Sequence, residues 1–257
     1  MTRILSGGLI CCALLIANRL DAQEHPAWPA RTVVFVDVPF QPLNNDFTES
    51  LSFADTTRKT ENVTFKARYE SERGALFSAG AGVRVVKNFG VGVTTCWFQR
   101  SSSGSFDLAV PNPLVANKPL SLTDSVSGLH REELGVHFQA LYPIAFGSRT
   151  HVMLSGGPSV FRTKQDLMRS IEFDRLPGFT ALKFDQALIT EREKTVAGFN
   201  VAADVSWILT SHFGVGTLVR YSRATVTLDP GSETGLSRAV ETHPGGLHIG
   251  GGIRFLF

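Results

Sequence analysis

The C-terminal segment of this 257-residue chain alternates strictly between two kinds of side chain. One set in residues 247–257 comprises Leu247, Ile249, Gly251, Ile253, Phe255 and Phe257, and the other comprises His248, Gly250, Gly252, Arg254 and Leu256. Successive side chains of a β-strand point to opposite faces. The segment is therefore predicted to be a strand with one apolar face and one face of glycines and charge.

Seven further segments show the same period of two. They are residues 63–69, 75–87, 91–99, 134–142, 152–160, 195–209 and 213–222. Several exceed the usual globular strand of about five or six residues, and about nine to eleven tilted residues are enough to cross a bilayer. Residues 32–40 and 47–56 add one more hairpin, so the count is eight or ten. We expect ten, because Val34, Val36, Val38 and Phe40 alternate as regularly as the later strands.

The connections between these segments alternate in length. Residues 87–90, 145–149 and 209–212 form short turns, whereas residues of about 101–128, 162–193 and 228–245 form long predicted loops. Short turns at one rim and long loops at the other are typical of outer-membrane barrels, in which the short side is periplasmic. The expected fold is therefore all-β, an antiparallel up-and-down transmembrane β-barrel of ten strands, with eight as the alternative.

The first 22 residues are predicted to be a signal peptide. Arg3 gives a positive start, and residues 4–17 carry no charge but are too few for a membrane-spanning helix. Cleavage after Ala22 would leave residues 23–257 as a single barrel domain. Cys11 and Cys12 lie within the signal, so Cys96 is the only remaining cysteine and no internal disulfide can form.

The mature chain resembles the small outer-membrane β-barrel proteins of the opacity-protein and outer-membrane-protein-A-like type. The resemblance rests on Phe257, the turn and loop alternation, and the Gly-Val-Gly openings of strands, as in residues 90–92 and 214–216. It implies the outer membrane of a Gram-negative-type bacterium, contact with its lipid, and recognition by the barrel-insertion machinery through Ile253, Phe255 and Phe257. Gly251 departs from the pattern, where a larger apolar residue is expected.

Two sets of side chains are candidates for a role in the barrel. Charged residues at predicted inward positions are Lys66, Arg84, Glu133, His137, Asp204, Arg220 and Arg254. Buried ions are expensive unless paired, so we expect a structural network; the alternative is that these residues line a narrow pore. Aromatic residues near outward strand ends are Trp97, Tyr142, Trp207 and Tyr221, which predict a girdle at the membrane interfaces.

The rest of the sequence gives little sign of chemistry. The formal net charge of +2, without a basic run, gives no support for a nucleic-acid partner. The residues His130, Glu132 and His137, with Ser155 or Ser159, match no catalytic motif, and the histidines lack metal-ligand spacing. We therefore expect no catalytic activity, cofactor or metal.

Three functions stay open. The first is a monomeric outer-membrane barrel with a structural or surface-interaction role, which the long loops favour because loops on a rigid scaffold usually carry function. The second is a narrow passive channel for ions or small solutes. The third is a soluble exported binding barrel of lipocalin type, which would place apolar residues inside.

Overall fold

The structure is a computed structural model that describes residues 28–54, 61–71, 73–229 and 240–257. The predicted signal peptide, residues 1–22, lies outside the described residues. The strands are β1 (Thr32–Gln41), β2 (Phe47–Ala54), β3 (Asn62–Ser71), β4 (Gly74–Ala75), β5 (Phe77–Val86), β6 (Phe89–Val110), β7 (Leu120–Phe146), β8 (Thr150–Arg175), β9 (Leu182–Thr210), β10 (Phe213–Ala224), β11 (Val226–Leu228), β12 (Val240–Thr242) and β13 (Gly245–Leu256). One short 3-10 helix, Pro177–Phe179, joins β8 to β9. No helix in the described part of the chain is long and apolar enough to cross a membrane.

Eight strands close into a ring, which confirms the antiparallel barrel. The order is β1, β5, β6, β7, β8, β9, β10 and β13, and β13 pairs with β1 from Val33–Leu256 to Phe40–Ile249. The favoured count of ten is not confirmed. The reason lies in β2 and β3: β2 pairs with β3, and β3 pairs with the far half of β6, so neither enters the ring.

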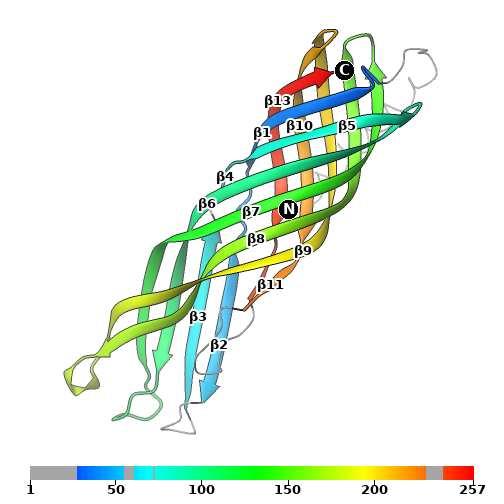
Figure 1. The fold of residues 1–257 in the computed structure, drawn as a ribbon. Helices are drawn as coiled ribbons and strands as arrows, with labels where there is room; N and C mark the ends of the chain where they lie inside the picture. Colours follow the sequence, from blue (N-terminus) through cyan, green and yellow to red (C-terminus); the bar gives the residue numbers. More distant parts are fainter. Residues whose placement is uncertain (1–27, 55–60, 72, 230–239) are drawn as a thin grey trace, which may run out of the picture.

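The three predicted short turns join strands at one rim of the ring (Figure 1). β5 ends at Val86 and β6 begins at Phe89, β7 and β8 are separated by residues 147–149, and β9 and β10 by residues 211–212. Lys87 and Gly147 take positive φ values of 39° and 81°, which lets the chain reverse within a few residues. The C-terminal strand ends at the same rim (Figure 1).

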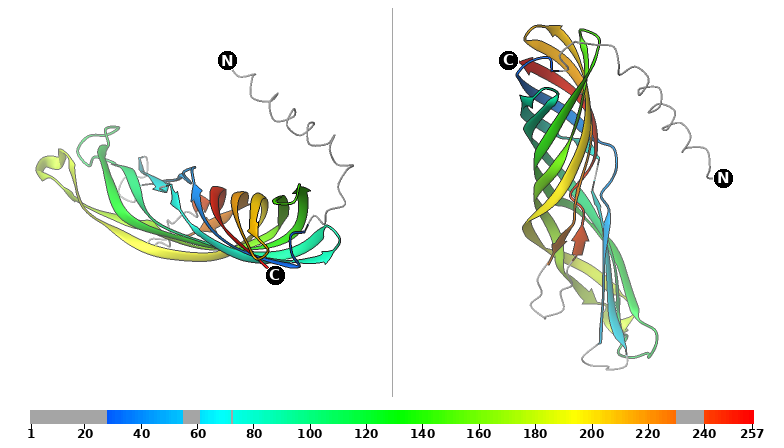
Figure 2. Two further views of the ribbon diagram at one scale, coloured as in Figure 1. Left: turned by 90° about the horizontal axis from the view of Figure 1, so that it is seen from above. Right: turned by 90° about the vertical axis from the view of Figure 1, so that its right-hand side faces the viewer.

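The predicted long loops at 101–128 and 162–193 are mostly strand, which corrects the sequence-based boundaries. β6, β7, β8 and β9 are 22, 27, 26 and 29 residues long in total, so each continues past the ring. Only short tips join them. With β2, β3 and the ladder of β11 with β12, they build a second structured region, here called the extension (Figure 2). The third predicted loop includes residues 230–239, which are not described.

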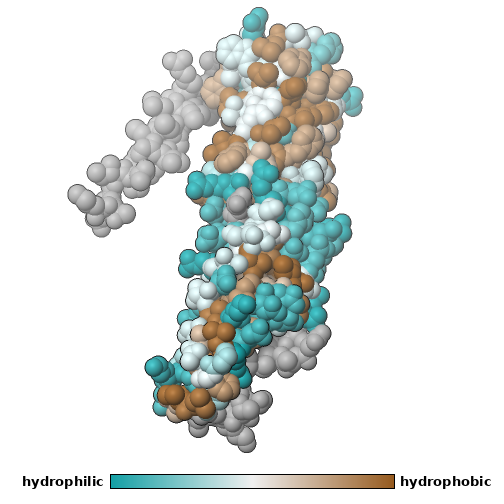
Figure 3. Space-filling model, turned by 90° about the vertical axis from the view of Figure 1, so that its left-hand side faces the viewer, coloured by the Kyte–Doolittle hydropathy of each residue, from teal (hydrophilic) through white to brown (hydrophobic). Residues whose placement is uncertain are grey.

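The two halves of β6, β7 and β8 bury opposite kinds of side chain, whereas the far half of β9 also leaves Leu188 and Ile189 exposed. On the ring half of β6, Val91 and Val93 are exposed while Thr94 is buried; on its far half, Ser103 is exposed while Phe106 is buried. The alternation of buried and exposed residues continues along the whole of β6. Before Gln99 the exposed residues are mainly apolar, and after it the buried residues are. Figure 3 shows the result as a largely apolar surface at one end of the molecule and a hydrophilic surface beyond it.

The extension therefore has an apolar core of its own. Its buried residues are Ala67, Tyr69, Phe106, Leu108, Val110, Leu120, Leu122, Leu129, Leu167, Met168, Leu182, Val226 and Leu228. Phe106 packs between the rings of Phe65 and Phe184, at centroid distances of 6.3 and 5.4 Å. Arg192 and Lys194 donate to backbone carbonyls of Asp229 and Thr227, which holds the β11 segment against β9. The extension is a folded unit with a water-facing exterior.

Candidate functional site

The outer wall of the ring carries a continuous apolar belt. Exposed members include Phe77, Val83, Val91, Val93, Phe138, Leu154, Val160, Phe199, Val201, Val205, Val215, Val219, Ile249, Ile253 and Phe255. A soluble protein rarely exposes a contiguous apolar patch of this kind, so the belt is a lipid-facing surface. It contradicts the soluble lipocalin-like alternative, although the extension does bury apolar residues as that alternative required.

The four predicted girdle residues lie on the outward face near the two edges of the belt. Trp97 and Tyr221 stand toward the extension, and Tyr142 and Trp207 stand near the short turns. The Trp97 indole donates to Glu132 at 3.2 Å. Ile253, Phe255 and Phe257 are exposed on the last strand. Their roles as interface anchors and as an insertion signal stay predictions.

An apolar plug fills the ring at the rim with the short turns. Trp28, Val33, Leu141 and Leu256 are buried together, with Phe35, Met153 and Ile208 against them. Gly90 makes this possible, because a Cβ at Gly90 would lie 2.4 Å from the Trp28 ring. The layer is apolar except for the buried Trp28 indole N–H.

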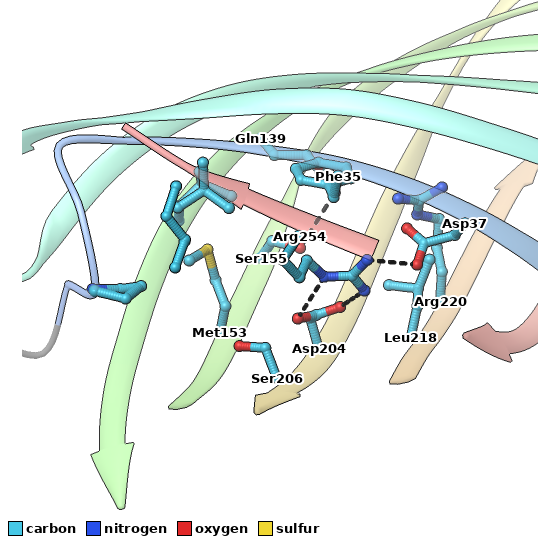
Figure 4. Close-up of a pocket in the computed structure, with 14 residues that line it drawn as sticks. Phe35, Asp37, Gln139, Met153, Ser155, Asp204, Ser206, Leu218, Arg220 and Arg254 are labelled. Carbon is cyan, nitrogen blue, oxygen red and sulfur yellow. Dashed lines mark hydrogen bonds and ion pairs between the residues drawn. The ribbon is translucent and has the colours of Figure 1, made fainter. Parts of the chain in front are cut away.

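A buried ionic layer lies directly inside the plug. The Arg254 guanidinium contacts the carboxylates of Asp37, at 2.7 Å, and of Asp204 (Figure 4). These three residues come from β13, β1 and β9, so the layer ties the closing seam of the ring to β9, two strands beyond β13. Glycines make room for it: a Cβ at Gly216 would lie about 3 Å from the guanidinium, and one at Gly252 would lie 2.5 Å from an Asp37 oxygen.

Arg220 and His137 form the next layer, without a carboxylate contact of their own. Arg220 is 1% exposed and donates to the Ser78 hydroxyl at 3.2 Å and to the Cys96 sulfur. The His137 Nδ1 lies 2.8 Å from the Ser159 hydroxyl. The Ser159 and His137 pair is sealed in the wall at 1% and 0% exposure, so a substrate has no access to it.

A second buried ion pair lies where the ring meets the extension, a position here called the neck. Arg131 and Glu133 contact each other at 2.6 Å, and Arg131 also donates to Gln165 and Thr242. The second oxygen of Glu133 accepts the backbone N–H of Gly245 at 2.9 Å. Both charges are satisfied by groups from four strands, which is the arrangement that a buried pair requires.

The structure thus brings together only part of the predicted interior set. Arg254 and Asp204 are in contact, whereas His137 and Arg220 lie in the next layer and Glu133 pairs with Arg131. Arg84 is exposed where β5 turns into β6, because the strand has already reached the rim. Lys66 is exposed on β3, whose apolar residues Ala67 and Tyr69 face the extension core instead. The placement of Arg84 and Lys66 in the interior network was therefore wrong.

Sequence reasoning missed Asp37 and Arg131, the partners of two predicted residues. Each had a signal: Asp37 is the single charge in an otherwise apolar alternating segment, and Arg131 lies two residues from Glu133 on one strand face. Among the described residues, no three side chains of His, Cys, Asp or Glu converge as metal ligands would.

The extension carries the water-accessible surface of the molecule, because the outer wall of the ring faces lipid. Its sides are polar, and Arg162 holds the pKa of the Glu193 carboxyl below its usual value through a two-point hydrogen bond. At the distal tip, the Asn112 side chain donates to the Phe179 carbonyl and so joins the two hairpin ends. Leu114, Val115 and Leu176 are exposed there, and Figure 3 shows apolar residues gathered again at this end.

Comparison with known proteins supports the fold alone. No protein-family model and no curated protein matches the sequence. Among solved structures, the outer membrane protein OprG from Pseudomonas aeruginosa has a TM-score of 0.50 at 9% identity, covering 90% of this chain and 98% of that one. Neisserial surface protein A (NspA) has a TM-score of 0.40 at 14% identity, covering 89% and 98%. The outer membrane protease OmpT from Escherichia coli has a TM-score of 0.42 at 7% identity, covering 88% and 97%.

The ring, the lipid-facing belt and the likeness to OprG agree with one another. Together they confirm the expected membrane environment. The chain has the fold of the small outer-membrane β-barrel proteins, with its belt in the lipid of that membrane.

Proposed function

We propose that this protein is a monomeric barrel that displays a rigid extension on the cell surface and acts through it, in a structural or surface-interaction role without catalysis. The observation that carries the proposal is that β6, β7 and β8 expose apolar side chains in the ring and bury them in the extension. A polar exterior around an apolar core is the design of a water-exposed domain, and the strands that form it are direct continuations of the membrane wall.

The interior argues against passage through the barrel. The plug around Trp28, the ionic layer of Arg254, the neck pair of Arg131 and Glu133, and the extension core follow one another along the axis. Eight strands leave an interior that side chains just fill. We therefore expect no stable conductance steps in a planar bilayer, and ion-selective steps would favour the channel alternative instead.

Labelling on intact cells tests which end faces outward. Single cysteines are placed at Ser103, exposed on the extension, and at Lys87, exposed in a short turn. A membrane-impermeant maleimide is expected to label Ser103→Cys on intact cells and Lys87→Cys only after lysis. The unmodified chain, whose Cys96 is buried, gives the background. Labelling of Lys87→Cys on intact cells would reverse the proposed orientation.

The role of the extension is tested by a matched pair of variants. Phe106→Asp places a charge in the extension core, whereas Ser105→Asp places it on the adjacent polar face. We expect Phe106→Asp to expose the extension to added protease while the ring keeps its heat-modifiable gel mobility. Cell adhesion and outer-membrane permeability are then compared for the two variants. If neither property differs, the extension does not carry the function.

A further inference from the structure

Four buried polar atoms inside the ring have no hydrogen-bond partner among the described residues. They are Asp37 Oδ2, Arg220 Nε, His137 Nε2 and His248 Nδ1, and each of these residues is 5% exposed or less. A buried polar group is expensive unless another group hydrogen-bonds to it. The four atoms therefore require a partner that the side chains of the ring do not supply.

Two of these atoms belong to side chains that border one cavity. Asp37 and Arg220 both line a cavity of about 40 Å³ beside the ionic layer (Figure 4). Gln139, Ser155 and Ser206 add polar groups to its wall. A water molecule needs roughly 10 to 15 Å³ of such space, so the cavity has room for about three. Water that accepts from Arg220 Nε and donates to Asp37 Oδ2 would satisfy both atoms.

The two histidines border a second, smaller cavity of about 10 Å³. His137 is on β7 and His248 is on β13, four strands apart in the ring of eight, so they come from opposite walls. Ser159 occupies the Nδ1 of His137, which leaves Nε2 without a partner. Gly135 borders the same cavity, and a Cβ there would lie 3.2 Å from that nitrogen. The cavity is about the size of one water molecule.

We propose that both cavities bind ordered water: one molecule is shared by the two histidines, and about three lie between Asp37 and Arg220. The charged residues around the larger cavity are two arginines and two aspartates. Their formal charges sum to zero, so a bound ion would be left uncompensated. Water can both donate and accept, so it suits either tautomer of His137.

The bound water would connect parts of the interior that do not touch directly. Arg220 borders the larger cavity and also donates to the sulfur of Cys96, which borders the smaller one. Arg254 of the ionic layer borders the larger cavity, and Glu133 of the neck borders the smaller one. The hydrogen-bond network therefore extends from the ionic layer to the neck.

A high-resolution crystal structure of the full barrel tests the proposal. We expect one density peak within hydrogen-bond distance of both His137 Nε2 and His248 Nδ1, and further peaks that join Arg220 Nε to Asp37 Oδ2. Crystals pressurised with xenon give a second reading, because xenon enters cavities that are dry and apolar. Missing peaks, xenon in either cavity, or a peak with the anomalous signal of an ion would overturn the proposal.

A matched pair of glycine variants tests the shared water. Gly135→Ala places a methyl group against His137 Nε2, whereas Gly251→Ala makes the same change at an exposed position. We expect Gly135→Ala to lose the shared peak and to raise the equilibrium constant for unfolding about tenfold, because the histidines lose their partner. Gly251→Ala should change neither. Unchanged or increased stability in Gly135→Ala would mean that the methyl group fills a dry cavity, which would overturn the proposal.

A second variant separates loss of water from crowding by the added methyl group. His248→Phe keeps a ring of similar size and removes its nitrogens. The shared peak should disappear from its crystal structure, while the peaks at Asp37 should stay. A peak that persists beside Phe at this position would show that the histidine pair does not bind the water. The reading holds even if Gly135→Ala fails to fold.

Discussion

Removal of the Arg254 side chain is expected to destabilise the barrel by about 3 kcal/mol. Deleting one partner of a buried ion pair lowers the free energy of unfolding by about 3 to 5 kcal/mol, because the other charge is left buried without compensation. Arg254→Ala would leave the two carboxylates of Asp37 and Asp204 facing each other. The Asp37 side chain is fully buried, but that of Asp204 is 19% exposed, so water screens part of its charge. The value therefore stays at the lower end of the range.

The measurement is urea unfolding of the barrel in lipid vesicles, followed by tryptophan fluorescence. The triple variant Arg254→Ala, Asp37→Asn, Asp204→Asn removes all three charges and should recover most of the lost stability, since a neutral layer leaves no uncompensated ion. Arg84→Ala serves as the control at an exposed arginine. Its free energy of unfolding should lie within about 0.5 kcal/mol of that of the unmodified protein.

Two results would refute this account of the ionic layer. A loss below about 1 kcal/mol in Arg254→Ala would mean that the carboxylates are hydrated or neutral in the folded barrel. A triple variant as unstable as the single one would mean that Arg254 contributes by filling space between Gly216 and Gly252, with the charges making no difference.

Three further predictions concern glycine, lipid and the extension. Gly252→Ala should abolish the heat-modifiable folded band, because its Cβ would lie 2.0 Å from a backbone oxygen, whereas Gly251→Ala, with 3.2 Å to its nearest atom, should fold normally. Val93→Arg, midway across the belt, should destabilise the barrel in vesicles by about 2 to 4 kcal/mol, and Ser103→Arg on the extension should not. Burial and the nearby Glu49 raise the pKa of Tyr69 above its usual 10.0, so a spectrophotometric titration should show ionisation above pH 10.0 that Tyr69→Phe removes. Because the folded state holds that proton more tightly, stability should begin to fall above about pH 10, and Tyr69→Phe should remove that dependence.

The alternation of residues predicts the strands and the antiparallel barrel, since it follows directly from the geometry of a pleated chain, but it favoured ten strands where eight close the ring. It predicts that two faces differ in polarity, and it cannot say which of them is inside. For residues 213–222 the apolar face meets lipid, and for residues 63–69 the same pattern meets a buried core. Lys66 was misplaced for that reason.

The interior contacts depend on information that local sequence does not hold. Asp37 and Arg254 are 217 residues apart and meet only because β13 returns to β1 with a particular register. The polar run Ser101–Ser102–Ser103 reads as a loop by composition, but its alternate neighbours Gly104, Phe106 and Leu108 continue the strand. The contacts between interior side chains and the lengths of the strands therefore become visible only once the ring is closed.

The unbroken passage of β9 from membrane to medium has a mechanical consequence. Its 29 residues exceed the ~11 needed for the bilayer by about 18, or roughly 60 Å of strand at ~3.3 Å per residue. Hydrogen-bonded neighbours accompany it on one side over that whole distance, so no flexible linker separates the distal tip from the wall. The distal tip is therefore rigidly connected to the barrel. A force applied to the tip acts as a torque on the strands within the lipid.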